Sequence, residues 1–219
     1  MNCLTSPRGP GSSDLFDEIA LAIETHGYII LPSALPPALT DALYFTLKDL
    51  DLACFKQARI GREEREIDNP FVRSDRILWI DGEQPALKEY LDWMEQLRLA
   101  VNRRLFLGLF DYECHFAYYA KGAFYKKHFD AFQGERNRVL TTVYYLNPNW
   151  QPQEGGQLQI YSPADGTLME TVQPSYGQMV VFLSERFPHE VVPAQRERYS
   201  LAGWFRVNNS LQGRIDPPA

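Results

Sequence analysis

The sequence has few features of secreted, membrane-spanning or nucleic-acid-binding proteins. Its three cysteines, Cys3, Cys54 and Cys114, are odd in number and widely spaced, and no CxxC pair occurs. We therefore expect no disulfide framework, which favours a reducing compartment. The longest apolar runs, such as MVVFL, are far too short to span a bilayer. These absences predict a soluble, cytoplasmic protein that does not bind membranes.

Basic residues do not exceed acidic ones: 22 Lys and Arg stand against 28 Asp and Glu, giving a formal net charge of −6. A surface that binds nucleic acid usually needs excess basic residues to neutralise phosphates, so nucleic acid is not an expected partner. Hydrophobic residues make up 45% of the chain and charged residues 23%, which are ordinary values for a globular protein. A length of 219 residues suits one domain.

Three segments have the apolar spacing of helices, and all of them precede residue 110. The first covers residues 15–25, with Asp14 as the expected cap and Gly27 just past its end. The second, at 36–52, starts with two prolines, which favour the first turn of a helix. The third, at 86–109, is a long amphipathic helix.

From about residue 112 the pattern changes to short segments rich in β-branched and aromatic residues, which is typical of strands. These segments are ECHFAYYA, RVLTTVYYLN, GQLQIY, TLMETVQP, GQMVVFL, HEVVP and RYSLAGWFRV, and earlier YIIL and DRILWI are also strand-like. Turn signals such as NPNW, EGG and SPADG separate them. This rhythm predicts a mainly β fold with a double-sheet jelly-roll core and helices packed outside.

Domain boundaries follow from the same patterns. Residues 1–13 are polar and read as a disordered lead-in rather than a signal peptide. Residues 14–207 form a single domain, with a helical part at 14–110 and the jelly-roll core at 111–207. Residues 208–219 form a tail.

The segment YKKHFDAF places His128 and Asp130 two residues apart in a strand-like pattern. On a strand such residues point to the same side, and an inward carboxylate is costly unless a cation meets it. His189, which opens HEVVP after an apolar strand, is a third candidate ligand. Two histidines and one carboxylate can occupy one face of an octahedron and leave three positions open, as in non-haem Fe(II) oxygenases.

Other interpretations of these histidines have to be weighed. A single histidine in a strand is more often a hydrogen-bonded structural residue, and we interpret His26 and His115 in that way. Zinc could also occupy the same three ligands in a hydrolase. The residues that follow His189 help to distinguish the two metals.

Arg198 lies nine residues after His189, inside the strand-like segment RYSLAGWFRV. If the two segments form an antiparallel hairpin, the guanidinium lies roughly 8–10 Å from the metal. This span suits a five-carbon diacid that chelates iron at one end and pairs its far carboxylate with Arg198. A zinc site offers no reason for such an arginine. Neighbouring Arg196 fits a solvated turn.

Four segments carry a resemblance to a known family: YAKGAFYKKHFD, RVLTTVYYLN, EGGQLQIY and PHEVVPAQRERYSLAGWF. In this order they closely resemble the 2-oxoglutarate-dependent prolyl 4-hydroxylases, in particular the hypoxia-sensing (PHD-like) branch and its bacterial relatives. The resemblance covers about residues 70–207. It implies a double-stranded β-helix fold, Fe(II) as cofactor, and 2-oxoglutarate and O2 as co-substrates, with ascorbate as a candidate reductant.

The resemblance also implies roles for individual residues. His128, Asp130 and His189 match the iron ligands, and Arg198 matches the residue that binds the far carboxylate of 2-oxoglutarate. Tyr145, the second tyrosine of YYLN, matches a tyrosine that is hydrogen-bonded to the same carboxylate.

Further positions match the walls and the entrance of the family's pocket. The residues that match pocket walls are Tyr119, Leu158 and Trp204. The pattern YxxGxxYxxHxD favours Tyr119 for its place, with Tyr118 as the alternative. Asp75 and Arg138 match an ion pair near the substrate entrance. The highly charged stretch KQARIGREEREIDNP at 56–70 is either a solvated loop or, as the resemblance implies, a mobile loop over the substrate.

We therefore expect a dioxygenase that uses 2-oxoglutarate and Fe(II) to hydroxylate a prolyl residue at C4 in a protein, releasing succinate and CO2. The absence of a signal peptide and of a disulfide framework favours a cytoplasmic, oxygen-sensor-like enzyme. Among bacterial relatives the resemblance points to elongation factor Tu as a candidate substrate. Two alternatives remain open: an oxygenase acting on a small molecule such as a free amino acid, and a non-catalytic jelly-roll interaction module that holds a structural metal.

Overall fold

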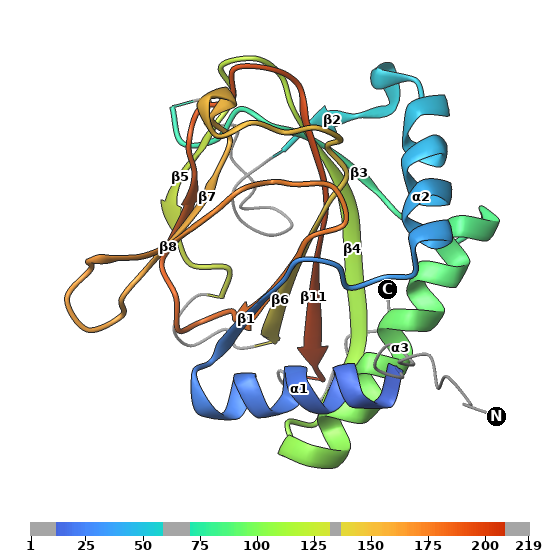
Figure 1. Ribbon diagram of the computed structural model, residues 1–219, viewed down its shortest axis with the longest axis vertical. Coiled ribbons are helices and arrows are strands. Elements are labelled where there is room, and N and C mark those ends of the chain that lie inside the picture. The colour runs from blue at the N-terminus through green and yellow to red at the C-terminus, as the bar shows by residue number, and fades with distance from the viewer. Residues whose placement is uncertain (1–11, 59–70, 132–136, 209–219) are drawn as a thin grey trace, which may run out of the picture.

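The computed structural model describes residues 12–58, 71–131 and 137–208. Its elements, in chain order (Figure 1), are α1 (Ser12–Thr25), β1 (Tyr28–Leu31), α2 (Pro37–Asp49), η1 (Leu52–Cys54), β2 (Lys56–Gln57), β3 (Arg76–Trp79), α3 (Pro85–Leu105), β4 (Leu109–Tyr119), β5 (Tyr125–His128), β6 (Arg138–Tyr145), η3 (Pro152–Glu154), β7 (Leu158–Tyr161), β8 (Leu168–Val172), β9 (Met179–Leu183), β10 (His189–Val191) and β11 (Arg198–Val207). Most of the expected lead-in, most of the charged loop and nearly all of the tail lie outside the described residues.

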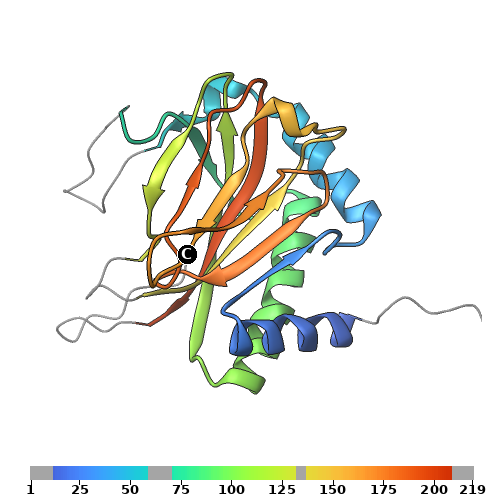
Figure 2. The same ribbon diagram turned by 60° about the vertical axis from the view of Figure 1, so that its left-hand side comes forward.

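The strands form two sheets that face each other. Within the described residues, the major sheet has the order β1-β9-β6-β11-β4-β3-β2 and the minor sheet has the order β5-β10-β7-β8. All strand pairs are antiparallel. Figure 2 shows the major sheet between the minor sheet on one side and the helices on the other. The predicted jelly-roll core with outer helices is confirmed.

Local sequence signals explain where the helices begin and end. α1 starts at Ser12, so Asp14 lies in its first turn and the prediction that Asp14 is the cap was wrong. Gly27 follows the end of α1 with a φ of 85°, a left-handed conformation that glycine adopts without steric cost. α2 has a proline in its first turn, as predicted. α3 ends at Leu105, four residues early, because Phe106 adopts φ 53° and breaks the helical repeat.

The connection between β10 and β11 differs from the sequence prediction. We expected a hairpin that would place Arg198 on a strand beside that of His189. Instead, β10 pairs with β5 and β7 in the minor sheet, whereas β11 pairs with β4 and β6 in the major sheet. The segment 192–197 crosses from one sheet to the other, so Arg198 and His189 approach the same space from opposite walls.

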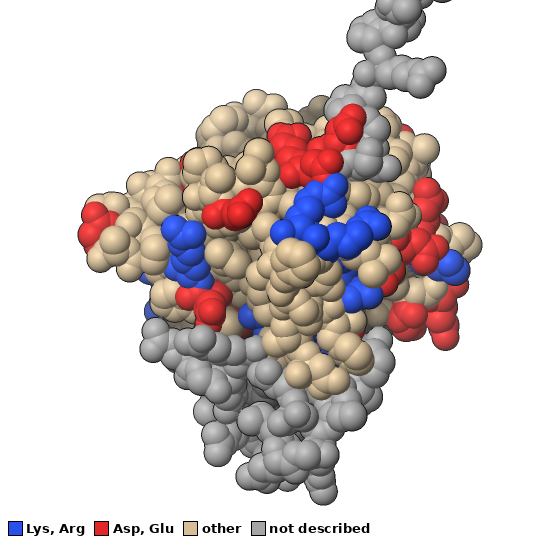
Figure 3. Space-filling model, turned by 90° about the horizontal axis from the view of Figure 1, so that it is seen from below, with Lys and Arg blue, Asp and Glu red and all other residues tan. Residues whose placement is uncertain are grey.

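The surface carries mixed charge. The face over α1 and the C-terminal end of α3, seen from below, shows acidic and basic side chains side by side (Figure 3). Such interspersed charges do not form a single-sign field over this face. No helix in the described part of the chain is long and apolar enough to cross a membrane.

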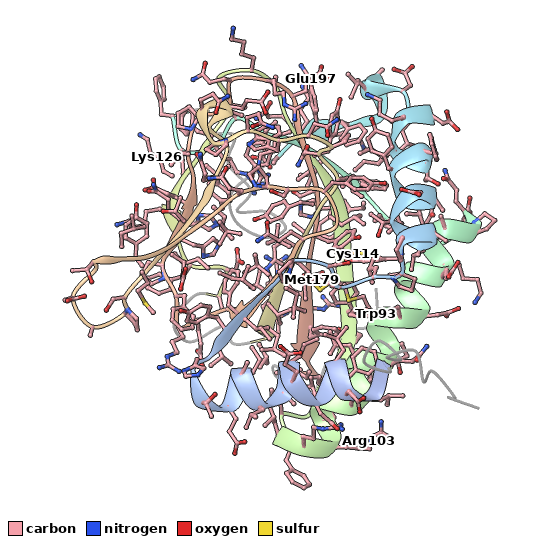
Figure 4. All side chains as sticks on the ribbon, in the orientation of Figure 1. Trp93, Arg103, Cys114, Lys126, Met179 and Glu197 are labelled. Carbon is pink, nitrogen blue, oxygen red and sulfur yellow. The ribbon has the colours of Figure 1, made fainter. Side chains whose placement is uncertain are left out.

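Two hydrophobic clusters occupy the two sides of the major sheet. The larger one fills the space between the sheet and the helices, and includes Trp93 of α3, Cys114 of β4 and Met179 of β9 (Figure 4). The smaller one lies between the two sheets and includes Tyr119 and Leu158. Because successive strand residues point to opposite faces, the central strands β4, β6, β9 and β11 contribute one row to the helical core and the other row to the space between the sheets.

Candidate active site

A cavity of about 1230 Å³ lies between the two sheets. Strand alternation decides which side chains reach it. On β11, Arg198, Ser200 and Trp204 line the cavity, whereas Tyr199 and Leu201 belong to the helical core. β3, β4 and β6 line it from the same sheet, and β5, β7 and β10 line it from the other. The cavity therefore combines side chains from both sheets.

Three potential metal ligands converge on one wall of this cavity. The ligand atoms of His128, Asp130 and His189 all lie within 4.8 Å of one another. His128 Nε2 is 3.5 Å from Asp130 Oδ1, and His189 Nε2 is 3.5 Å from Asp130 Oδ2. The two histidines are brought together by strand pairing, since His128 is opposite His189 in the β5–β10 ladder. β5 ends at His128, so Asp130 lies in the following bend and not, as expected, on the strand itself.

Each histidine ring is oriented by a hydrogen bond from Nδ1 to the backbone carbonyl oxygen of the residue two positions earlier. The Nδ1 atom of His128 donates to the carbonyl oxygen of Lys126 at 2.7 Å, and that of His189 donates to the carbonyl oxygen of Phe187 at 3.0 Å. Because a carbonyl oxygen can only accept, Nδ1 carries the proton and Nε2 presents its lone pair. This is the usual way in which a protein fixes the tautomer of a metal-binding histidine.

The protonation states also suit a cation. Burial lowers the pKa of His189 to about 4, so its imidazole is neutral at neutral pH. Burial alone would raise the pKa of Asp130, but His189, His128 and Arg138 outweigh it and hold this pKa below its ordinary value. Neutral imidazole and ionised carboxylate are the forms that bind metal ions.

Thr141 supports the carboxylate and was not predicted from the sequence. Its Oγ1 donates to Asp130 Oδ2 at 2.8 Å, and Ser184 Oγ lies 2.9 Å from the same hydroxyl. Since the Thr141 proton goes to the carboxylate, Ser184 donates to Thr141. Alternation along β6 was the available signal, because Thr141 shares its face with the predicted site residue Tyr145.

Arg198 is a buried cation that faces the cavity. It is 1% exposed, its Nε donates to the Gly156 carbonyl oxygen at 2.8 Å, and one terminal nitrogen lies 3.3 Å from Ser200 Oγ. Among the residues that the structure describes, no carboxylate pairs with it. Burying an unpaired guanidinium is costly, so the arrangement favours an anionic ligand at this end of the cavity.

Two tyrosines flank Arg198, and of the two candidates on β4 it is Tyr119 that faces the cavity. Tyr119 lines the cavity and its ring centroid is 4.7 Å from the guanidinium carbon. Tyr118 points to the helical side, where its hydroxyl donates to Glu197. Tyr145 lies 5.1 Å from the guanidinium carbon, and its buried hydroxyl has no hydrogen-bond partner in the described structure. That orphaned hydroxyl is a second group that an anion beside Arg198 would satisfy.

The remaining predicted walls are also in place. Leu158 is 2% exposed and Trp204 is 8% exposed, and both line the cavity. Trp204 lies under the guanidinium of Arg138, at 3.6 Å from the ring centroid, and 5.4 Å from the ring of His115. His115, which we had left as structural, also lines the cavity.

The expected ion pair between Asp75 and Arg138 is not among the ion pairs of the described residues. Asp75 is fully buried and accepts two hydrogen bonds from Arg73, at 2.8 and 2.6 Å. Arg138 pairs instead with Glu113, at 2.8 Å. Both residues line the cavity. The partner of Asp75 lies just before β3, and the partner of Arg138 lies on β4.

The donor set fits an Fe(II) ion. Neighbouring ligands around an octahedral ion with bonds of about 2.1 Å lie about 3 Å apart. Each imidazole Nε2 is 3.5 Å from one oxygen of the Asp130 carboxylate, and one ligand atom from each of the three residues lies within 4.8 Å of the others, so small side-chain movements would bring all three to one ion. Two imidazoles and one carboxylate are the ligand types that non-haem iron takes, with the other positions left open. An ion held by these three residues would be open to the cavity, which Arg198 also lines.

Comparison with known proteins shows which proteins this chain is similar to. Residues 114–206 match the family model of the 2OG-Fe(II) oxygenase superfamily. A prolyl-4-hydroxylase of Pseudomonas putida has a similar structure, with a TM-score of 0.79 and 44% identity over 88% of this chain and 99% of that one.

Animal proteins are similar as well. A prolyl hydroxylase of Trichoplax adhaerens, solved in complex with a peptide fragment of the hypoxia inducible factor oxygen degradation domain, gives a TM-score of 0.77 and 27% identity over 89% of this chain and 90% of that one. The human prolyl hydroxylase EGLN3 is 27% identical over 188 residues, which are 82% of this chain and 78% of that protein.

Proposed function

Because the chain belongs to the 2OG-Fe(II) oxygenase superfamily, as a PHD-like 2-oxoglutarate-dependent prolyl hydroxylase, we propose that it acts on a prolyl residue within a protein. The reaction adds a hydroxyl group at C4 of the proline and converts 2-oxoglutarate and O2 to succinate and CO2. The observation that carries the proposal is an unpaired, buried Arg198 that shares one cavity with the His–Asp–His cluster.

We assign a role to each residue of the site. His128, Asp130 and His189 hold Fe(II) through Nε2, a carboxylate oxygen and Nε2, which are the atoms that converge. Arg198 binds the far carboxylate of 2-oxoglutarate, and the orphaned hydroxyl of Tyr145 donates to the same carboxylate. Both contacts would be charge-assisted and shielded from water, which makes them stronger than the same contacts at a surface.

The bound iron supplies the oxidative decarboxylation of 2-oxoglutarate and the oxidation of the proline C4–H bond. The protein holds the metal-ligand side chains in position. Thr141 holds the Asp130 carboxylate, and backbone carbonyl groups hold both imidazoles. Tyr119, Leu158 and Trp204 are buried walls of the cavity, where they would exclude water and so limit competing oxidations.

A protein substrate is supported by the relatives. The Trichoplax enzyme was solved with a peptide fragment bound, and the bacterial resemblance points to elongation factor Tu. We therefore propose elongation factor Tu as the first protein to test, which also implies that the enzyme works in the cytoplasm. We assign Arg138, which lines the cavity, as a contact for the peptide, whereas Asp75 lines the cavity but is fully buried and holds Arg73.

The test is to incubate the protein with Fe(II), 2-oxoglutarate and ascorbate in air, with purified elongation factor Tu or with free proline. We expect a mass gain of one oxygen atom on a prolyl residue of the protein substrate, with an equal amount of succinate. The His128→Ala variant serves as the control, and it should be folded and inactive.

Each other outcome has a clear meaning. Hydroxylation of free proline alone would make the chain a small-molecule oxygenase. Succinate without hydroxylated elongation factor Tu would exclude that substrate, and a proteome extract analysed by mass spectrometry would then identify the target. No succinate above the His128→Ala level would overturn the enzymatic function and favour a metal-holding interaction module.

A further inference from the structure

A tyrosine ring lies flat against one of the three ligand histidines. The rings of Tyr125 and His128 are stacked, with centroids 3.5 Å apart and planes 14° from parallel. The two residues are three positions apart on β5, and regular alternation would place them on opposite faces. The β5–β10 ladder shows why they meet: His189 is opposite His128, but Val191 is opposite Tyr125, so the register shifts by one residue between these pairs. An irregularity of this kind re-aims a side chain.

Tyr125 is itself held by an arginine from another part of the chain. The guanidinium carbon of Arg73 is 4.3 Å from the centroid of the Tyr125 ring, which is a cation–π contact. Arg73 is fixed in turn by two hydrogen bonds to Asp75, whose side chain is fully buried. The order of contacts is therefore carboxylate, guanidinium, phenol ring and imidazole.

The backbone reinforces the same arrangement. An isolated bridge joins Arg73 to Tyr125. On one side of it, the Lys126 amide donates to the Val72 carbonyl oxygen at 2.9 Å; on the other side, the Ser74 amide donates to the Phe124 carbonyl oxygen at 3.1 Å. Residues 72–74 thus run alongside β5 and add a short segment to the free edge of the minor sheet.

We propose that Tyr125 is a positioning residue for His128, and that Arg73, fixed by Asp75, holds Tyr125 in place. The bond from Nδ1 to Lys126 leaves the plane of the imidazole free to tilt about that contact, and the stacked ring removes this freedom. A metal bound at Nε2 draws electron density from the imidazole, which strengthens its attraction to the aromatic face. The inference rests on the proposed function only in taking His128 as an iron ligand.

The test measures metal affinity without 2-oxoglutarate and without protein substrate, so that substrate contacts do not enter. Co(II) is titrated into the metal-free protein and followed by its visible absorption, and Fe(II) affinity is measured by chelator competition without oxygen. We expect Tyr125→Leu to weaken binding about 10- to 100-fold, the range for residues that orient a metal ligand. Tyr125→Phe keeps the ring and should bind as the wild type does.

Two further variants complete the design. Arg73→Met retains the Tyr125 side chain but removes the guanidinium that holds it, and should weaken metal binding several-fold. It also decides the question if Tyr125→Leu does not fold. Tyr161→Leu is the matched control, because Tyr161 is a tyrosine of the same sheet, on β7, that does not line the cavity. Its metal affinity should be unchanged.

The outcomes separate this inference from the proposed function. Wild-type affinity in Tyr125→Leu, together with lost affinity in His128→Ala, would overturn the positioning role alone. A raised KM for the protein substrate with unchanged metal affinity would likewise make Tyr125 a substrate contact. Unchanged affinity in His128→Ala would overturn the ligand assignment on which both rest.

Discussion

At the scale of single residues, the site depends on charges placed where water does not reach. Arg198 is 1% exposed, and its hydrogen-bond partners among the described residues are a carbonyl oxygen and a hydroxyl, with no carboxylate. A surface arginine would lose little if its partner were absent, because water would solvate it. Under the proposed function the partner of Arg198 is the far carboxylate of 2-oxoglutarate, so this arginine would select a dicarboxylate.

Arg198→Ala should raise the KM for 2-oxoglutarate a hundredfold or more, since removal of one partner of a buried pair costs about 3–5 kcal/mol. Iron affinity should hardly change. Arg198→Lys should recover only part of the loss, because an ammonium group cannot reproduce the two-point contact. Arg196→Ala is the control, since Arg196 pairs with Glu154 away from the cavity. Titration of succinate formation measures all three, and wild-type KM in Arg198→Ala would contradict the role.

The buried side chain of His115 should make the stability of the fold depend on pH. Burial lowers its pKa from the ordinary value of 6.5 to about 3, with Arg73 and Arg138 acting in the same direction. Between these values the unfolded chain binds a proton at His115 that the folded chain does not bind. The free energy of unfolding therefore falls as pH is lowered below about 6.5, by up to about 1.4 kcal/mol per pH unit from this group.

His115→Met should remove that contribution. We expect the metal-free variant to lose less stability than the metal-free wild type between pH 6.5 and pH 4, with parallel curves above pH 7. Denaturant unfolding at a series of pH values measures the difference. Identical slopes in both proteins would show that His115 protonation is not linked to folding.

At the scale of elements, the turn between η3 and β7 positions the arginine. Gly155 and Gly156 both have φ of 67°, and a Cβ on Gly155 would lie 2.2 Å from the Pro193 carbonyl oxygen. Gly156 accepts the Arg198 Nε hydrogen bond, and a Cβ there would lie 3.1 Å from Arg198 Cδ. The two glycines let the chain pass close enough to hold the guanidinium, which gives the GG of the sequence motif a physical reason.

Gly156→Ala should therefore act on 2-oxoglutarate binding. We expect the KM for 2-oxoglutarate to rise about tenfold, corresponding to roughly 1.4 kcal/mol, with iron affinity unchanged. Gly166→Ala is a matched control, because Gly166 has a similar φ of 73° but no atom within 4 Å of an added Cβ. It bears the same backbone strain and leaves Arg198 in place. An equal KM in both variants would contradict this function of the turn.

Periodicity predicted most elements because helices and strands leave different spacings of apolar residues in the sequence. It could not predict sheet membership. A spacing of nine positions from His189 to Arg198 suits a hairpin and a crossover equally well, and the packing of two sheets decides between them. The prediction of an Asp75–Arg138 ion pair was wrong for a related reason, because the partners of a side chain across strands depend on the strand register. Thr141 and Tyr125 were overlooked because their roles arise from contacts with residues distant in sequence or displaced by the register shift.

At the scale of the whole molecule, the His–Asp–His cluster connects the two sheets. His128 and His189 belong to the minor sheet, whereas Asp130 is hydrogen-bonded to Thr141 of the major sheet. A bound ion should therefore stabilise the fold as a whole. At a free concentration a hundred times its Kd, it adds about 2.7 kcal/mol, or roughly 5–10 °C in Tm for a domain of this size.

Thermal unfolding with Mn(II), compared with unfolding in a chelator, measures this effect. Asp130→Ala should lose the Tm rise, and Thr141→Val should keep part of it because the three ligands remain. A full rise in Asp130→Ala would mean that the ion binds elsewhere.

The depth of Arg198 has a kinetic consequence. The guanidinium is 1% exposed, whereas Phe129 and Trp79, which line the same cavity, are 46% and 52% exposed. We expect a small diacid to enter past these outer residues to reach Arg198, and a polypeptide lying across them would block this route. The enzyme would then work by a compulsory order, with the diacid entering before the polypeptide and succinate leaving after the hydroxylated chain. Succinate should accordingly compete with 2-oxoglutarate but not with the polypeptide, a pattern that steady-state product inhibition would reveal.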